Sequence, residues 1–122
     1  MDIQKLTTAD GQEVIRISGN GPLIVNAQSA LDLIMTVQYK TGCSRLILPE
    51  KIFTEKFFSL KTGLAGEILQ KFVNYHFKVA IIGDFSGYRS KSLADFIYES
   101  NKGWQVSFLP DEESALLWFQ EN

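Results

Sequence analysis

The polar residues best suited to bind a ligand lie in one short stretch, residues 83–92, with the sequence GDFSGYRSKS. Its two glycines let the backbone approach a ligand closely, and serine hydroxyls beside the amides of a helix start can hold an anion. The alternative is a turn followed by a helix cap, in which a serine only satisfies free helix amides. The candidate ligand-binding or switch residues of this stretch are Asp84, Ser86, Tyr88, Arg89, Ser90 and Ser92.

Three further candidates lie upstream, at Lys61, Thr62 and Glu67. A Lys-Thr pair ends a phosphate-binding loop, but that loop needs a glycine directly before the lysine, and this chain has Leu60 there. Nucleotide hydrolysis therefore loses its main support. Glu67 lies near the predicted start of a helix, where the helix dipole favours a negative charge. With Asp84 it could also form a carboxylate pair for acid–base chemistry, and the sequence leaves open whether the two share a site.

The lone cysteine and the lone histidine, Cys43 and His76, have the side-chain types of a nucleophile and a base. Each precedes a predicted parallel strand, so both are expected at the amino edge of the sheet. A strand of about seven residues, at roughly 3.3 Å each, separates His76 from Asp84 by about 20 Å, so Asp84 cannot orient the imidazole. We expect a buried structural Cys43 and a surface His76. One Cys and one His cannot build an ordinary zinc site, so neither a metal nor a cofactor is predicted.

Strand and helix signals alternate along the chain and must position these residues. Strands are predicted at residues 3–8, 12–18, 23–25, 45–48, 77–83 and 104–109. Helices are predicted at residues 30–39, 54–59 and 63–75, then from Ser90 or Ser92 to about residue 101, and after Asp111. Asp10-Gly11 suits a type I′ hairpin turn, which needs a positive φ at both central residues. Ser29 is expected to cap the first helix.

This order predicts one α/β domain over residues 1–122. Its expected architecture is a single-layer, mostly parallel (mixed) sheet with an N-terminal β-hairpin and helices packed on it. Ligands of such sheets collect outside the carboxyl ends of the strands, where helix N-termini point. Three segments are expected to meet at that edge: residues 49–62, 84–92 and 110–111.

Composition bounds the class of protein. The 122 residues are 45% hydrophobic and 21% charged, as in an ordinary globular domain, and a net charge of −2 without a basic cluster argues against nucleic-acid binding. No apolar run reaches the roughly 18 residues of a membrane-spanning helix, and no apolar leader follows Met1. A single cysteine favours a reducing compartment. We therefore expect a cytoplasmic protein without nucleic-acid or membrane partners.

Nine Phe, four Tyr and two Trp are more aromatic residues than a small core needs. They either belong to the core or form an exposed patch for an apolar ligand or for self-association as a homodimer. The residues concerned are Phe53, Phe57, Phe58, Tyr98, Trp104, Trp118 and Phe119. Trp118 and Phe119 cannot both lie deep, because neighbouring helical positions diverge by about 100°.

Several stretches resemble the bacterial domain-of-unknown-function family 4180. They are FFSLKTGLAGEILQKF at residues 57–72, GDFS at 83–86, SKSLADF at 90–96 and ESNKG at 99–103. The resemblance covers essentially the whole chain and is strongest after Phe57. It implies a fold and a bacterial source, and it brings no catalytic residue with it.

The element order is also similar to that of the STAS domain, the fold of bacterial anti-sigma-factor antagonists. Those proteins carry a phosphorylatable serine at a helix N-terminus, in an Asp-x-Ser context after a central strand. Asp84-Phe85-Ser86 has this spacing after the predicted strand at residues 77–83. The likeness is one of topology, which by itself is a weak guide to function.

Three functions remain open at this point. The first is a non-enzymatic regulatory or protein-interaction module with an unidentified protein partner, favoured by the STAS-like order and by the lack of a complete catalytic constellation. The second is a small-ligand or anion-binding domain that uses the loop at residues 84–92 or the aromatic surplus. The third is a small enzyme in which Asp84, Glu67 or Lys61 is a working group.

Overall fold

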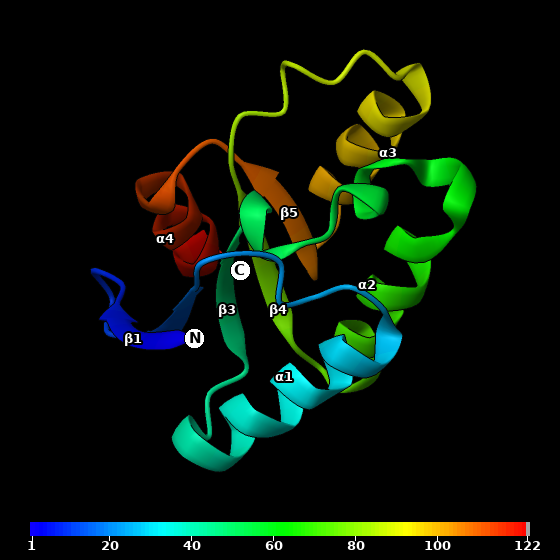
Figure 1. Cartoon of the computed structure of the whole chain (residues 1–122). Coiled ribbons are helices and arrows are strands. Elements are labelled where there is room, and N and C mark those ends of the chain that lie inside the picture. The colour runs from blue at the N-terminus through cyan, green and yellow to red at the C-terminus, as the bar shows by residue number, and fades with distance from the viewer. Residues whose placement is uncertain (122) are drawn as a thin grey trace.

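Short apolar runs form the five strands of one sheet in the computed structural model, which describes residues 1–121 (Figure 1). The strands lie in chain order, β1-β2-β3-β4-β5. Three 3₁₀ turns, η1 (Glu50–Ile52), η2 (Glu55–Phe58) and η3 (Leu60–Thr62), follow β3. The strands and helices are β1 (Asp2–Thr7), β2 (Glu13–Ser18), α1 (Ala27–Thr41), β3 (Arg45–Pro49), α2 (Leu64–Asn74), β4 (Lys78–Ile82), α3 (Lys91–Asn101), β5 (Val106–Leu109) and α4 (Glu112–Glu121).

The strand directions confirm the predicted mixed sheet with an N-terminal hairpin. β1 pairs with β2 in antiparallel orientation, and every other neighbouring pair is parallel. Each parallel connection runs through one helix, and right-handed crossovers between successive neighbours place their helices on the same face of the sheet. The helices α1, α2 and α3 accordingly share one face, and α4, which follows the last strand, covers the other (Figure 1).

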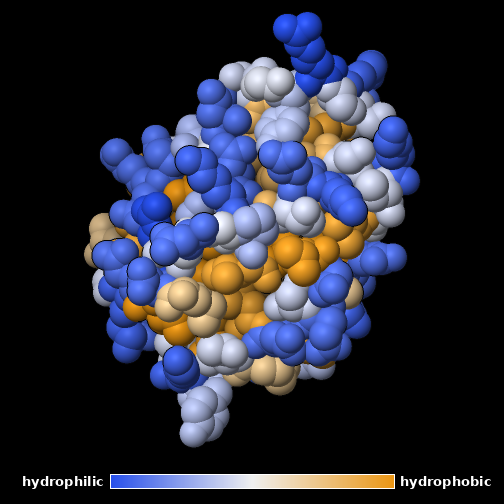
Figure 2. Space-filling model, viewed as in Figure 1, coloured by the Kyte–Doolittle hydropathy of each residue, from blue (hydrophilic) through white to orange (hydrophobic). Residues whose placement is uncertain are grey.

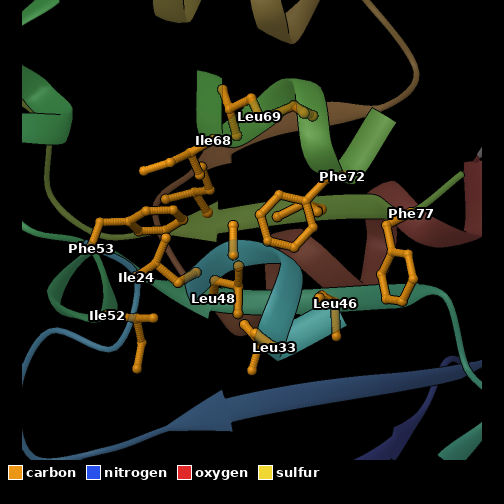
Figure 3. Packing of buried hydrophobic residues seen from close by; sticks show 14 of the residues in the cluster. Ile24, Leu33, Leu46, Leu48, Ile52, Phe53, Ile68, Leu69, Phe72 and Phe77 are labelled. Atoms are coloured by element: carbon orange, nitrogen blue, oxygen red, sulfur yellow. The ribbon is translucent and has the colours of Figure 1, made fainter. Parts of the chain in front are cut away.

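The alternation of side chains along each strand divides the core into two clusters. In β4, Val79 and Ile81 pack on the face covered by α1, α2 and α3, whereas Ala80 and Ile82 pack beneath α4. The first cluster is the larger one. Figure 3 shows that β3 runs from Leu46 to Leu48 toward Ile24 and Phe53, which close the core at the carboxyl edge of the sheet.

Helix α1 begins earlier than the sequence analysis predicts, so the assignment of Ser29 as its N-cap is wrong. Asn26 is the N-cap, and its side-chain oxygen accepts the Ser29 N–H at 2.8 Å. Ser29 returns the contact, because its Oγ accepts the Asn26 N–H at 3.1 Å. The pair is a capping box in which serine fills the place where glutamate or glutamine is expected.

Two other local predictions are corrected, and a third is made more specific. The β1–β2 turn is not type I′, because Gly11 has a φ of 90° but Asp10 does not have a positive φ. Residues 23–25 form no strand, only a single bridge between Ile24 and Phe53, since Pro22 lies directly before them and the cap of α1 directly after them. The short, turn-rich helix predicted at residues 54–59 is present as the 3₁₀ helix η2 (Glu55–Phe58), whose amides reach back three residues, as from Phe57 N–H to Thr54 O.

Hydrophobic and hydrophilic side chains are both exposed on the surface. Figure 2 shows a band of hydrophobic residues across the face seen in Figure 1, bordered by hydrophilic residues. Among residues 1–121, no helix combines the length and the hydrophobicity needed to cross a bilayer.

The end of α2 is a Schellman motif built on His76. The His76 N–H donates to Val73 O at 3.0 Å, and the Phe77 N–H donates to Phe72 O at 2.9 Å. His76 has a φ of 61°, in the left-handed region where its Cβ is crowded and glycine is not. The histidine side chain is exposed, so nothing in the core requires it.

Replacing His76 with glycine is therefore expected to raise the free energy of unfolding by about 0.5–1 kcal/mol. The free energy gained by relieving the backbone strain exceeds the free energy lost because glycine adds entropy to the unfolded chain. Urea denaturation followed by circular dichroism measures it. The matched control is Tyr75→Gly at the preceding residue, whose φ is −98°. Glycine relieves no strain there, so that variant should lose stability; a loss in both variants would contradict the prediction.

Candidate functional site

The loops at the carboxyl edge of the sheet are joined by backbone hydrogen bonds. The amides of Leu23 and Ile24 both donate to Ile52 O, at 2.8 and 2.9 Å, and the Thr54 N–H donates to Ile24 O at 2.9 Å. The segment after β2 and the segment after β3 thus form one continuous rim. This rim holds the side chains of η1 and η2 in place above the ends of the parallel strands.

Aromatic side chains anchor the same edge. Phe53 and Phe57 pack with ring centroids 4.3 Å apart, and Phe57 lies 4.9 Å from Phe58. Phe58 in turn stacks on Tyr88 at 5.0 Å with an interplanar angle of 25°. Phe58 also contacts Phe85, at 6.1 Å. Part of the aromatic surplus is therefore core, and it fastens the loop after β4 to the turns after β3.

Between these loops lies a pocket of about 420 Å³, here named the Glu50 pocket. Three aromatic rings, two carboxylates and one lysine contribute to its wall. Its lining residues are Gly21, Pro22, Glu50, Lys51, Phe53, Glu55, Phe58 and Tyr88. A pocket of this size at the carboxyl edge of parallel strands is the usual position and volume of a small-molecule site.

Among the polar groups that line this pocket, Glu50 is the one held most firmly in position. Its Oε1 accepts the Asp84 N–H at 3.3 Å, and its Oε2 lies 3.5 Å from the Tyr88 hydroxyl, which donates to it. Its side chain lies directly against Gly83, where an added Cβ would be 2.7 Å from the Glu50 carboxyl carbon. Glycine at residue 83 is therefore what lets Glu50 lie flat over the end of β4. Both hydrogen bonds are long, which leaves the carboxylate with acceptor capacity toward the pocket.

The local electrostatics keep Tyr88 protonated. Its partial burial disfavours the phenolate, and the nearby carboxylates of Glu50 and Glu55 add to that effect, so the pKa of Tyr88 is raised above its usual value near 10. At neutral pH the Tyr88 hydroxyl therefore keeps its proton and can donate it to Glu50.

A second pocket, here named the Lys61 pocket, lies on the other side of Phe58 and has a volume of about 410 Å³. It brings Lys61 together with Ser90 and Ser92, three candidates that the sequence could not place relative to one another. Ser90 is the N-cap of α3, and its Oγ accepts the Leu93 N–H at 3.2 Å. The capping interpretation of Ser90 is thus confirmed, and Ser92 lies inside the helix.

The remaining candidates lie outside both pockets. Asp84 Oδ1 accepts the Ser86 hydroxyl at 2.6 Å and the Ser86 N–H at 3.0 Å, and these bonds lower the pKa of Asp84. Thr62 serves local structure, since its hydroxyl donates to Ser59 O and accepts the Leu64 N–H. Arg89 and Glu67 are exposed and line neither pocket.

Ser86 does not lie at a helix N-terminus. Helix α3 begins at Lys91 with Ser90 as its cap, so Ser86 stands four residues before the cap. Its hydroxyl is directed to Asp84 within the loop. The spacing of Asp84-Phe85-Ser86 is therefore not accompanied by the helix amides that stabilise a phosphate in the antagonist pattern.

Cys43 and His76 are separate structural features. Cys43 is buried, and its thiol donates to Glu13 O at 3.2 Å, whereas His76 is exposed at the end of α2. Both observations agree with the sequence analysis. Among residues 1–121, no three or more His, Cys, Asp or Glu side chains gather in a group that could hold a metal ion.

Glu50, Lys51 and Glu55 are the charged pocket residues that sequence reasoning missed. The signal was present, because Glu50 directly follows the buried strand β3 and Gly83 directly follows β4. Residues 49–62 were assigned to this edge, but nothing in the spacing indicates that Glu50 packs on Gly83. That contact depends on the neighbouring, in-register pairing of β3 and β4, in which Pro49 lies opposite Ile82.

Comparison with known proteins gives one match. The family model described as Domain of unknown function (DUF4180) matches residues 9–119, which is nearly the whole chain. A search of curated proteins and a search of solved structures each found no match.

Proposed function

Since this chain belongs to the family described as Domain of unknown function (DUF4180), a description that assigns no activity, we propose its function from the geometry of the carboxyl edge. The proposal is a non-enzymatic regulatory module that binds a small molecule in the Glu50 pocket. The main observation behind it is the position of the Glu50 carboxylate, which lies over Gly83 on the wall of an aromatic pocket. This carboxylate can accept further hydrogen bonds from a ligand. Such a convergence of apolar wall and one placed polar group is typical of ligand sites.

The other parts of the proposal rest on the sequence. A bacterial source follows from the family resemblance, and a cytoplasmic location from the single free cysteine, Cys43. A regulatory role related to STAS domains stays a prediction. So does the enzyme alternative, for which Asp84 is poorly suited as a general acid because its lowered pKa keeps it ionised at neutral pH.

The test is a fragment library screened by ligand-observed NMR against the wild type and two variants. Glu50→Gln removes the charge and keeps the shape of the side chain, and Gly83→Ala forces Glu50 away from the end of β4. Compounds that bind the wild type should lose affinity for both variants. The matched control is Glu113→Gln, the same change at an exposed residue of α4. Hits that bind all four proteins equally, or no hits at all, would contradict the proposal.

A second candidate function is self-association, and one observation favours it. A groove of about 330 Å³ lies between α2 and α3, and Leu69, Val73 and Phe96 contribute to its apolar lining. Trp104 also lines the groove but is 66% exposed, which is unusual for the largest apolar side chain. Large exposed apolar surface of this kind marks interaction sites, so we propose that this groove is where a homodimer would form.

Sedimentation velocity over a range of protein concentrations tests this second candidate. The wild type should show a concentration-dependent dimer, and Trp104→Ser should shift the equilibrium toward the monomer. Tyr39→Ser is the matched control, because Tyr39 is 91% exposed on α1 and lies outside the groove. A wild type that remains monomeric at the highest concentration rules the candidate out.

A further inference from the structure

The charge around the Glu50 pocket points to the chemistry of its ligand. The charged lining residues are Glu50, Glu55 and Lys51, which leaves one net negative charge. Glu55 and Lys51 are exposed, whereas Glu50 is partly buried and in contact with Gly83. The sheltered charge of the pocket is therefore a carboxylate.

Glu50 cannot easily withdraw from a ligand that enters the pocket. The backbone at Gly83 lies directly beneath its carboxyl group, and the Asp84 N–H holds Oε1. A ligand that covers Glu50 removes water from a fixed negative charge, and this desolvation is costly unless the ligand supplies a compensating donor or cation. A neutral ligand without a donor, or an anion, would leave the carboxylate with only the long hydrogen bonds from Asp84 and Tyr88 to offset its lost hydration.

The aromatic wall adds a second requirement. Phe58 is 6% exposed and Tyr88, which stacks on it, is 39% exposed, so Tyr88 offers most of the accessible aromatic surface of the pocket. A planar apolar group can stack on such a surface, and a cation beside the rings gains further from their negative faces. Burial is the largest cause of the raised pKa of Tyr88, and the negative charges of Glu50 and Glu55 beside this wall raise that pKa further.

We infer that the Glu50 pocket selects an organic cation, a protonated amine attached to a planar apolar ring, with the amine on Glu50 and the ring against Tyr88 and Phe58. This inference rests on the proposed function, since it names the class of ligand for the same pocket. It goes beyond that proposal because it specifies the charge and the shape of what binds.

Three matched probes test the inference: tryptamine, tryptophol and indole-3-acetate, which share one ring system and carry a positive, a neutral and a negative end. Dissociation constants are measured by NMR titration at low ionic strength. Tryptamine should bind about tenfold more tightly than tryptophol, as a charge-assisted hydrogen bond allows, and indole-3-acetate should bind most weakly. Glu50→Gln should reduce the ratio of tryptamine to tryptophol affinity to about one, and Glu113→Gln should leave it unchanged.

The outcomes separate this inference from the proposed function. Equal binding of the three probes, or tighter binding of indole-3-acetate, overturns the cation preference. If none of the three probes binds but fragments from the library bind in a Glu50-dependent manner, the cation inference is wrong and the ligand-binding function stands. If neither the probes nor the fragments depend on Glu50, both are wrong.

Discussion

Replacing Phe58 with alanine is expected to lower the free energy of unfolding by about 3–5 kcal/mol, the range for a buried phenylalanine. The ring is 6% exposed, contacts Phe53 and Phe57, and stacks on Tyr88 in the wall of the Glu50 pocket. Its removal leaves a cavity where the turns after β3 meet the loop after β4. Because Phe58 lines both pockets, the same change should also merge them.

Urea denaturation monitored by circular dichroism measures this loss. The control is Tyr39→Ala, an aromatic truncation at a side chain that is 91% exposed, which should change stability by less than about 0.5 kcal/mol. Phe58→Leu should recover much of the lost stability, since it fills most of the cavity. A loss below about 1 kcal/mol for Phe58→Ala would mean that the ring is not packed at this edge.

Replacing Phe119 with alanine is expected to have an effect of similar size, about 3–5 kcal/mol, on the opposite face of the sheet. Phe119 is 1% exposed and belongs to the smaller cluster, to which α4 contributes only one other buried residue, Ala115. Polar contacts at both ends of α4 also hold this helix against the sheet. At the first turn of α4, Glu112 Oε1 lies 2.6 Å from the Arg16 guanidinium, and at its last turn Phe119 O accepts from the Gln12 amide.

Because the cluster beneath α4 is small, the loss of the Phe119 ring could release α4 alone or unfold the whole chain. Hydrogen exchange on Phe119→Ala distinguishes the two, because local detachment accelerates exchange in α4 and spares β4. Leu117→Ala is the matched control, since Leu117 lies on the same helix but is 52% exposed. Equal losses of stability in Phe119→Ala and Leu117→Ala would contradict the assignment of Phe119 as the anchor of α4.

Much of the fold could be predicted because its signals are local. The sequence shows directly the apolar runs of β3, β4 and β5 and the periodic apolar stripe of α2. Residues that interrupt regular structure, such as Pro49 and Gly103, mark where elements end. The two errors with a clear cause concern backbone geometry. The turn at Gly11 and the cap at Asn26 each depend on which of several adjacent polar residues takes the special conformation, and neighbours in the sequence compete for that role.

The candidate site was predicted only in part. Tyr88, one of the predicted candidates, lines the Glu50 pocket, and this pocket lies at the edge of the sheet where the sequence analysis expects a ligand. Asp84 and Ser86 proved to be partners of each other instead of pocket residues, because an Asp two residues before a Ser can close a local hydrogen-bonded turn. Glu50 was missed because its neighbour in space, Gly83, lies 33 residues away along the chain.

By itself, the sequence determined the class of this protein: an α/β sheet with a hairpin at its start, a buried Cys43, an exposed His76 and one edge at which polar loops collect. Hydrophobic periodicity and turn residues act over a few residues, so they can be read along the chain. Only the tertiary structure decided which side chains meet at that edge. The register of β3 and β4 places Glu50 on Gly83, and packing of Phe58 on Tyr88 divides the edge into two pockets. Such contacts depend on pairing between distant segments, which no local pattern encodes.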